Sequence, residues 1–303
     1  MTPSVTTGES YVLATAAYNE EALIEKVITS VCAQTVPPKK WVLVSDGSAD
    51  RTDEIVRRYA SKYSFIKLLR VQEEHARDFA AQVNAINLGF AQLAGLEYSF
   101  IGNLDADVVF GPTYFARLIE KFRRNPRLGL AGGSILEERN GRFQARRTNN
   151  PRAVAHAVQF FRRECFQTIG GYVALKYGGP DWHAELIARM NGWEVQSFDD
   201  LEVHHLRPTG TADKLLKHVF RQGRMDYSLG SYAPFEFLKC MRRLREKPLI
   251  IGGLARFGGF LWSACVGEKR EASAEVVRFL RNEQKSRTGF FLSGRISRPT
   301  VSA

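Results

Sequence analysis

The chain has 303 residues, of which 44% are apolar and 25% are charged, which is the composition of an ordinary globular protein with a sizeable core. The four cysteines show no close spacing, which argues against both a structural zinc site and a disulfide framework. The first residues lack the basic stretch and apolar run of a secretory signal. We therefore expect a protein of the reducing cytoplasm.

The net charge of +11 is concentrated in the last third of the chain. Residues 1–205 hold 24 Lys and Arg against 24 Asp and Glu, whereas residues 206–303 hold 19 against 8. In that third the basic residues alternate with large apolar ones, so it is predicted to face phospholipid, a phosphorylated lipid or nucleic acid. The alternative is a basic surface that is merely solvated.

Strands and helices alternate through the first hundred residues. Apolar runs predict the strands, and apolar residues at helical spacing predict the helices between them. The predicted strands are residues 11–17, 40–45, 65–71 and 98–104, and the predicted helices are residues 20–33, 52–63 and 80–94. Such alternation is typical of an α/β fold with a mostly parallel central sheet and helices on both faces.

Three of these strands end in polar clusters, namely Tyr18-Asn19-Glu20, Asp46-Gly47-Ser48 and Asp105-Ala106-Asp107. Ligands of open parallel sheets bind beyond the carboxyl ends of the strands, so the clusters are predicted to converge on one site. Residues i and i+2 of an extended strand share a face, which would let both carboxylates of the third cluster meet one ligand. Carboxylate oxygens are ligands that suit magnesium or manganese.

The middle of the chain continues the pattern less regularly. Residues 129–163 contain strand-like runs. Residues 178–183 (GGPDWH) open a predicted helix that runs to about residue 191, with Asp181 near its first turn and Gly192 as its C-terminal stop. A strand over residues 193–198 leads to a second extended run, 201–206, which contains His204 and His205.

The basic last third begins after this run. Residues 235–244 predict a basic amphipathic helix, with apolar and basic residues on different faces. Residues 249–266 are apolar but interrupted by Arg256 and several glycines, which makes them a poor membrane span and favours an interfacial or packed segment. We predict a catalytic domain over residues 1–210 and a helical extension over residues 211–303.

Five blocks stand out along the chain: residues 16–21 (AAYNEE), 44–52 (VSDGSADRT), 85–89 (AINLG), 105–107 (DAD), and 161–164 (FRRE) running through 169–172 (IGGY). In order and spacing they resemble the inverting glycosyltransferases of family 2, whose nucleotide-sugar-binding domain has the fold called type A. The resemblance spans about residues 10–230.

The resemblance implies a role for each matching residue. It implies that the nucleotide sugar is bound by Ala17, Tyr18, Glu20, Asp46, Arg77, Asp105 and Ala106. It further implies that Asp107 binds a divalent metal, Mn²⁺ or Mg²⁺, and that His204 or His205 completes that site. Neighbouring side chains of a strand point to opposite faces, so at most one of these two histidines should face the metal. Asp181 would be the general base, with Trp182 beside it on the acceptor side.

The function implied is transfer of a sugar from a nucleotide-diphosphate donor to a hydroxyl of a carbohydrate or lipid-linked acceptor, in cell-surface polysaccharide or glycolipid synthesis. The basic extension would attach the enzyme peripherally to the anionic inner face of the cell membrane. The alternative is a non-catalytic protein on the same scaffold that binds a nucleotide sugar or a membrane. Nucleic acid is not an expected partner because the glycines and apolar run of the last third fit it poorly. A dinucleotide-dependent oxidoreductase is disfavoured because no Gly-x-Gly-x-x-Gly follows the first strand.

Overall fold

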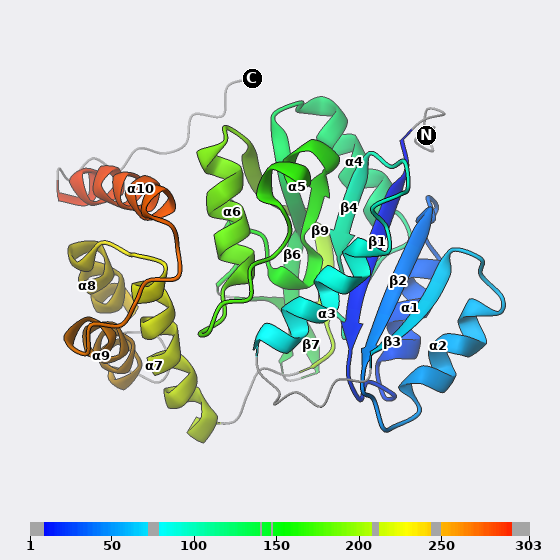
Figure 1. Ribbon diagram of the computed structural model, residues 1–303, viewed down its shortest axis with the longest axis horizontal. Coiled ribbons are helices and arrows are strands. Elements are labelled where there is room, and N and C mark those ends of the chain that lie inside the picture. Colours follow the sequence, from blue (N-terminus) through cyan, green and yellow to red (C-terminus); the bar gives the residue numbers. More distant parts are fainter. Residues whose placement is uncertain are drawn as a thin grey trace. The chain divides into compact units, whose positions relative to one another are not determined.

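The computed structural model describes residues 9–71, 79–139, 141–146, 148–207, 212–243 and 250–292. The chain forms two compact units (Figure 1). The first consists of residues 1–174 and 180–209, and the second of residues 175–179 and 210–303. The short segment 175–179 is grouped with the helices of the second unit, a feature that the sequence had not indicated.

The described strands of the first unit form a single sheet. The strands are β1 (Tyr11–Ala17), β2 (Lys40–Asp46), β3 (Ile66–Val71), β4 (Phe100–Asn103), β5 (Val108–Phe110), β6 (Leu128–Arg139), β7 (Arg142–Ala145), β8 (Phe160–Arg162) and β9 (Glu194–His205). Their order in the sheet is β3-β2-β1-β4-β8-β6-β9-β5, and β7 pairs with β6.

The strands from the N-terminal part of the chain, β1 to β4, are parallel to one another, and the rest of the sheet is mixed. Strand β1 runs parallel to β2 and to β4, and β2 runs parallel to β3. Strand β8 is antiparallel to both of its neighbours, whereas β6 and β9 are parallel. The carboxyl ends of β1, β2 and β4 therefore lie at one edge of the sheet, as the strand-helix alternation predicted.

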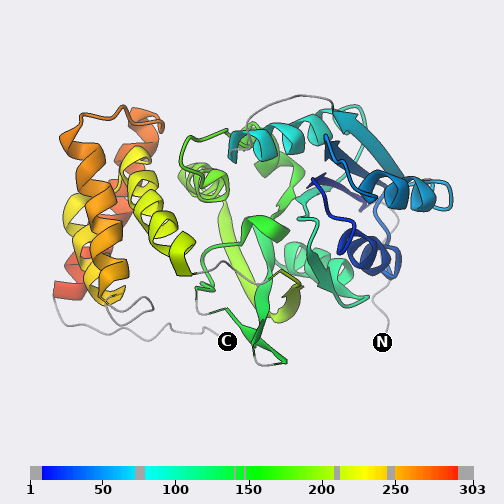
Figure 2. The same cartoon turned by 90° about the horizontal axis from the view of Figure 1, so that it is seen from below.

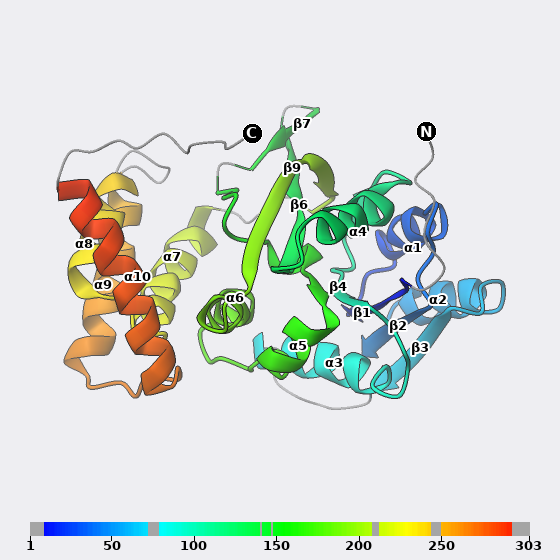
Figure 3. The same cartoon turned by 90° about the horizontal axis from the view of Figure 1, so that it is seen from above.

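Helices cover both faces of this sheet, which confirms the predicted fold class. Along β1, Tyr11 and Leu13 enter one hydrophobic core, and Val12 and Ala14 enter the other, because side chains alternate along a strand. The helices of this unit are α1 (Ile24–Cys32), α2 (Thr52–Ala60), α3 (Phe79–Ala91), α4 (Tyr114–Arg124), α5 (Arg163–Ile169) and α6 (Pro180–Met190), with a 3-10 turn η1 (His156–Val158). Helices α1 and α4 lie on one face, and α3 and α5 lie on the other (Figure 3).

The second unit is helical, with α7 (Ala212–Ser228), α8 (Ala233–Arg242), α9 (Ile251–Cys265) and α10 (Ala274–Leu292) packed together (Figure 2). Helices α7 and α9 approach closely at two glycines. A Cβ on Gly223 would lie 1.8 Å from the carbonyl oxygen of Arg256, and one on Gly259 would lie 2.0 Å from that of Phe220. These glycines thus allow helix packing. No helix within the described ranges is long and apolar enough to cross a membrane.

A buried ionic cluster explains the arginine that interrupts the apolar segment 249–266. The guanidinium of Arg256 lies 2.7 Å from Oδ2 of Asp226, which also lies 2.9 Å from Nζ of Lys239. Lys239 contacts Glu236 as well, at 2.6 Å, and burial raises the pKa of Glu236 to about 7. Because a buried charge needs partners, Arg256 points inward and pairs within the helical unit.

Candidate functional site

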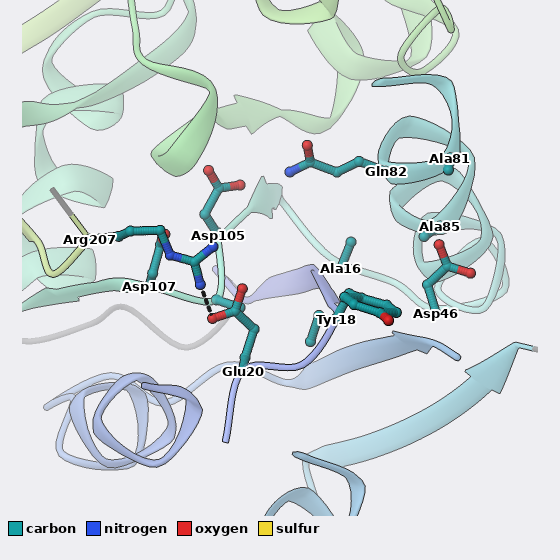
Figure 4. Close-up of a pocket in the computed structure, with 12 residues that line it drawn as sticks. Ala16, Tyr18, Glu20, Asp46, Ala81, Gln82, Ala85, Asp105, Asp107 and Arg207 are labelled. Atoms are coloured by element: carbon teal, nitrogen blue, oxygen red, sulfur yellow. Dashed lines mark hydrogen bonds and ion pairs between the residues drawn. The ribbon is translucent and has the colours of Figure 1, made fainter. Parts of the chain in front are cut away.

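A cavity of about 300 Å³ opens at the carboxyl ends of β1, β2 and β4 (Figure 4). Seven residues predicted from the sequence line it: Ala17, Tyr18, Glu20, Asp46, Asp105, Ala106 and Asp107. It is also lined by five residues that were not predicted: Ala16, Ala81, Gln82, Ala85 and Arg207. Arg77 was predicted as well, but it lies outside the described residues.

The loop after β1 and the loop after β2, which form one side of the cavity, are joined by hydrogen bonds. The backbone N–H of Asn19 donates to Oγ of Ser48 at 3.2 Å, and the N–H of Ala49 donates to Oδ1 of Asn19 at 2.9 Å. The N–H of Glu20 donates to Oγ1 of Thr52 at 2.7 Å. Asn19 has a φ of 50°, a left-handed conformation that asparagine tolerates better than most residues. These polar residues of the two motifs therefore shape the loops that present Tyr18, Glu20 and Asp46.

Asp105 and Asp107 lie in the turn between β4 and β5, not on a continuous strand as expected, and both still line the cavity. The carboxylate of Asp105 lies 3.3 Å from Nδ1 of His156. Burial by itself would raise the pKa of Asp105, but the charge and hydrogen bond of His156 outweigh burial and lower it. Asp105 is thus held as a carboxylate.

Asp107 has two basic neighbours. Its Oδ2 lies 3.5 Å from Nε2 of His205 and 3.5 Å from Nε of Arg207. Arg207 also pairs with the carboxylate of Glu20, an interaction drawn in Figure 4. Burial raises the pKa of Glu20 although Arg207 opposes it. Arg207 was not predicted from the sequence: its only local signal is its position two residues after His205, and its contact with Glu20 depends on folding.

The pairing of β5 with β9 decides which histidine faces Asp107. Val108 lies opposite His205, and Val109 lies opposite His204. The ring of His204 stacks on Phe143 at 4.3 Å between ring centroids, and its Nε2 lies 3.6 Å from Glu202. His204, named with His205 as a candidate metal ligand, is therefore not placed to share a metal with Asp107.

The donors near Asp107 fit a metal that substrate phosphates help to hold. No group of three or more Asp, Glu, His or Cys suited to a metal ion occurs in the described part of the chain. Magnesium in phosphate-transfer sites often takes one or two carboxylates and fills its other positions with phosphate oxygens and water. Asp107 supplies one such carboxylate. His205 stands beside it as a candidate nitrogen ligand, and its buried Nδ1 has no hydrogen-bond partner among the described residues.

Asp181 and Trp182 begin helix α6 and are half-buried, and neither lines the cavity. The backbone oxygen of Asp181 accepts a hydrogen bond from Nε2 of Gln159 at 3.4 Å. One turn further along, Glu185 is buried and accepts the N–H of Val154 at 2.6 Å. Burial raises the pKa of Glu185 to about 8, although Arg189, whose Nη1 lies 3.4 Å from Oε2 of Glu185, opposes the rise.

Known proteins resemble this chain in both sequence and fold. It is 31% identical over 127 residues to the poly-beta-1,6-N-acetyl-D-glucosamine synthase of Staphylococcus epidermidis. The aligned residues make up 42% of this chain and 28% of that protein. It is 28% identical over 223 residues to the glycosyltransferase AglE of Haloferax volcanii, covering 68% and 69% of the two chains. The chain thus spans little more than a quarter of the first relative's length.

Two solved structures share the fold. The mannosyltransferase PcManGT from Pyrobaculum calidifontis, in complex with GDP-Man and Mn²⁺, superposes with a TM-score of 0.55 at 17% identity and covers 96% of this chain and 82% of that one. Residues 1–349 of S. aureus TarS, in complex with UDP-GlcNAc, give a TM-score of 0.52 at 14% identity over 95% and 76%. The model of the family described as glycosyl transferase family 2 matches residues 13–178, so the chain belongs to that family.

Proposed function

We propose that the protein transfers a sugar from a nucleoside-diphosphate donor to an acceptor hydroxyl, with inversion at the anomeric carbon. The observation that supports this most is the convergence of Asp46, Asp105 and Asp107 on one cavity of a family 2 chain. The solved structures named above contain GDP-Man or UDP-GlcNAc, which supports a donor of that class.

In this proposal the cavity binds the nucleotide. Asp46 accepts hydrogen bonds from the base or ribose, because a carboxylate can only accept them. Asp105 accepts from the ribose, and Ala17, Tyr18 and Ala106 line the nucleoside. Glu20 and Asp107 hold Arg207 at the opposite side of the cavity, where its guanidinium adds positive charge toward the diphosphate (Figure 4).

Asp107 and His205 would hold Mn²⁺ or Mg²⁺ at the diphosphate. The metal supplies Lewis-acid stabilisation of the leaving diphosphate. Asp181 acts as the general base: its carboxylate takes the proton of the acceptor hydroxyl as that oxygen attacks the anomeric carbon and the bond to the diphosphate breaks. Trp182, its neighbour in the chain, offers an apolar surface for the acceptor sugar.

A thermal-shift screen tests the donor half of the proposal. Full-length protein is heated with UDP, GDP, dTDP or CDP, each with and without Mn²⁺. We expect one nucleotide to raise the melting temperature and to require the metal, since a ligand at 100 times its Kd stabilises the native state by about 2.7 kcal/mol. No shift with any nucleotide would contradict the proposal. If a nucleotide binds but the protein, incubated with the matching nucleotide sugar and acceptor, releases no nucleoside diphosphate, the non-catalytic alternative would be favoured instead.

We also propose that the second unit attaches the enzyme to the anionic inner face of the cell membrane, where a lipid-linked acceptor would be available. Helices α8 and α9, which pack against each other, expose several large apolar side chains: Phe237, Met241, Ile251, Leu254, Leu261 and Trp262. Apolar groups left exposed on neighbouring elements often mark a membrane or protein interaction site. Lys269 and Arg270 are exposed just beyond α9, so apolar and basic groups occur together as a lipid surface requires.

Sedimentation with anionic liposomes tests this attachment. We expect the protein to sediment with vesicles containing phosphatidylglycerol at low salt. A variant with Leu254→Ser and Trp262→Ser should partition at least about tenfold less, because it lacks two apolar side chains that would be buried in the membrane. Leu88→Ser, an equally polar change at an exposed leucine of the first unit, is the control and should not alter partitioning. Equal sedimentation of the double variant and the wild type would rule out this surface.

A further inference from the structure

The backbone of η1 brings one histidine, His156, against the Asp-x-Asp turn. Strand β8 pairs antiparallel with β4, and the pairing continues past both strands: the N–H of Asn103 donates to the carbonyl oxygen of Gln159 at 2.9 Å, and that of Asp105 donates to Ala157 at 3.0 Å. The side-chain amide of Asn103 then donates to the carbonyl oxygen of His156 at 2.7 Å. His156 is therefore fixed through its backbone as well as through its ring.

Hydrogen-bond chemistry assigns the proton on this ring. Nδ1 of His156 lies 3.3 Å from Oδ1 of Asp105, and an ionised carboxylate can only accept, so Nδ1 must carry a hydrogen. The amide nitrogen of Asn103 also lies 3.3 Å from Nδ1, but two donors cannot bond to each other. The amide of Asn103 donates to the backbone oxygen of His156, which leaves Nδ1 beside Oδ1 of Asp105.

The pKa of His156 also depends on the charge of the candidate base, Asp181. Burial alone would lower the pKa of His156, yet the carboxylates of Asp105 and Asp181 together raise it. The ring of Tyr172 lies 5.3 Å away between centroids, and burial keeps its hydroxyl protonated by raising its pKa well above 10. The ring of His156 thus lies against the nucleotide-binding carboxylate of Asp105, and the charge of Asp181 acts on it as well. Its Nε2 is buried and has no hydrogen-bond partner among the described residues.

We propose that His156 is a positioning residue that orients the carboxylate of Asp105 toward the ribose hydroxyls of the donor. A carboxylate already held by a hydrogen-bond donor loses little freedom when the ribose binds, and preorganisation of this kind raises affinity. This inference rests on the proposed function, because it assigns the ribose to Asp105. It adds a residue from outside the five sequence blocks to the donor site.

Two isosteric variants separate the hydrogen bond from the packing of the ring. The side-chain nitrogen of asparagine can occupy the place of Nδ1, whereas that of glutamine reaches the place of Nε2. We expect His156→Asn to keep donor affinity within about threefold of wild type and His156→Gln and His156→Ala to weaken it about tenfold or more, the usual effect of losing a charge-assisted hydrogen bond. Calorimetry with Mn²⁺ and whichever of UDP, GDP, dTDP or CDP the wild type binds measures this.

The 2′,3′-dideoxy form of the same nucleotide provides the decisive comparison. If His156 acts through Asp105 on the ribose, wild type and His156→Ala should bind the dideoxy form equally weakly. A purely structural defect would weaken both nucleotides alike, and that result would overturn the inference, as would unchanged affinity of His156→Ala for the natural nucleotide. Should His156→Ala fold poorly, the same comparison between the asparagine and glutamine variants decides. Absence of nucleotide binding by the wild type would refute the proposed function itself.

Discussion

The variant Asp181→Asn is expected to lose about 10²–10⁴ in kcat while its affinity for the donor nucleotide stays unchanged, because general-base catalysis contributes rate enhancement of that size. Asparagine has the shape of aspartate but cannot accept the proton of the attacking hydroxyl. Asp181 does not line the nucleotide cavity, so its replacement should leave donor binding intact. Single-turnover kinetics and calorimetry measure the two quantities separately.

A matched control is available one turn along the same helix. Burial raises the pKa of Glu185 to about 8, and its two carboxyl oxygens accept from the N–H of Val154 and from Nη1 of Arg189. Glu185→Gln keeps the size of the side chain and an oxygen for the N–H of Val154, and it should leave kcat within about twofold because Glu185 has no part in the proposed proton transfer. A loss of transfer in Glu185→Gln equal to that in Asp181→Asn would assign the effect to the helix and contradict the role of Asp181.

The variant Asp107→Ala is expected to abolish metal-dependent nucleotide binding. Asp107 is the carboxylate placed beside His205 at the cavity, whereas Asp46 and Asp105 lie with the nucleoside in our proposal. Removing the ligand itself should weaken metal affinity by at least about 100-fold, the upper range seen when only an outer-shell partner is removed. The measurement is the Mn²⁺-dependent part of the thermal shift with the nucleotide that the wild type binds.

Asp181→Asn serves as the comparison for this second variant. It should retain the Mn²⁺-dependent shift that Asp107→Ala loses, since the two carboxylates act at different ends of the reaction. Equal loss of binding in both variants would refute the division between a metal-binding and a proton-accepting aspartate. Loss of the unliganded protein's own thermal transition in Asp107→Ala would point to misfolding, and Asp107→Asn, which preserves size, then replaces it.

Much of the fold followed from local patterns. The helix predicted over residues 20–33 is α1, from Ile24 to Cys32, and the predicted strand over residues 40–45 is β2, from Lys40 to Asp46. Burial on a sheet or helix face imposes a period of 2 or 3.6 on the apolar residues, so such elements can be recognised without knowledge of their partners. The polar runs that end the strands then located the cavity, because parallel strands share one carboxyl edge.

Pairing between distant segments could not be predicted in this way. The single strand β9 replaces the two short runs expected over residues 193–198 and 201–206, and it continues through a register shift opposite Gly133 and Ser134 of β6. Likewise, Gly223 and Gly259 gave no local signal of the close contact between α7 and α9. Each feature depends on a partner far away in the chain, which a pattern over neighbouring residues does not contain.

The sequence by itself determined the alternating α/β architecture and the carboxylates at the cavity, Asp46, Asp105 and Asp107, because these depend on periodicity and on where strands end. Only the tertiary structure decided that His205 and not His204 faces Asp107, since the register between β5 and β9 sets that choice. The same holds for Arg207 and His156, whose contacts with Glu20 and Asp105 join segments far apart in the chain. Their roles arise from the contacts that folding creates, and no local spacing encodes those contacts.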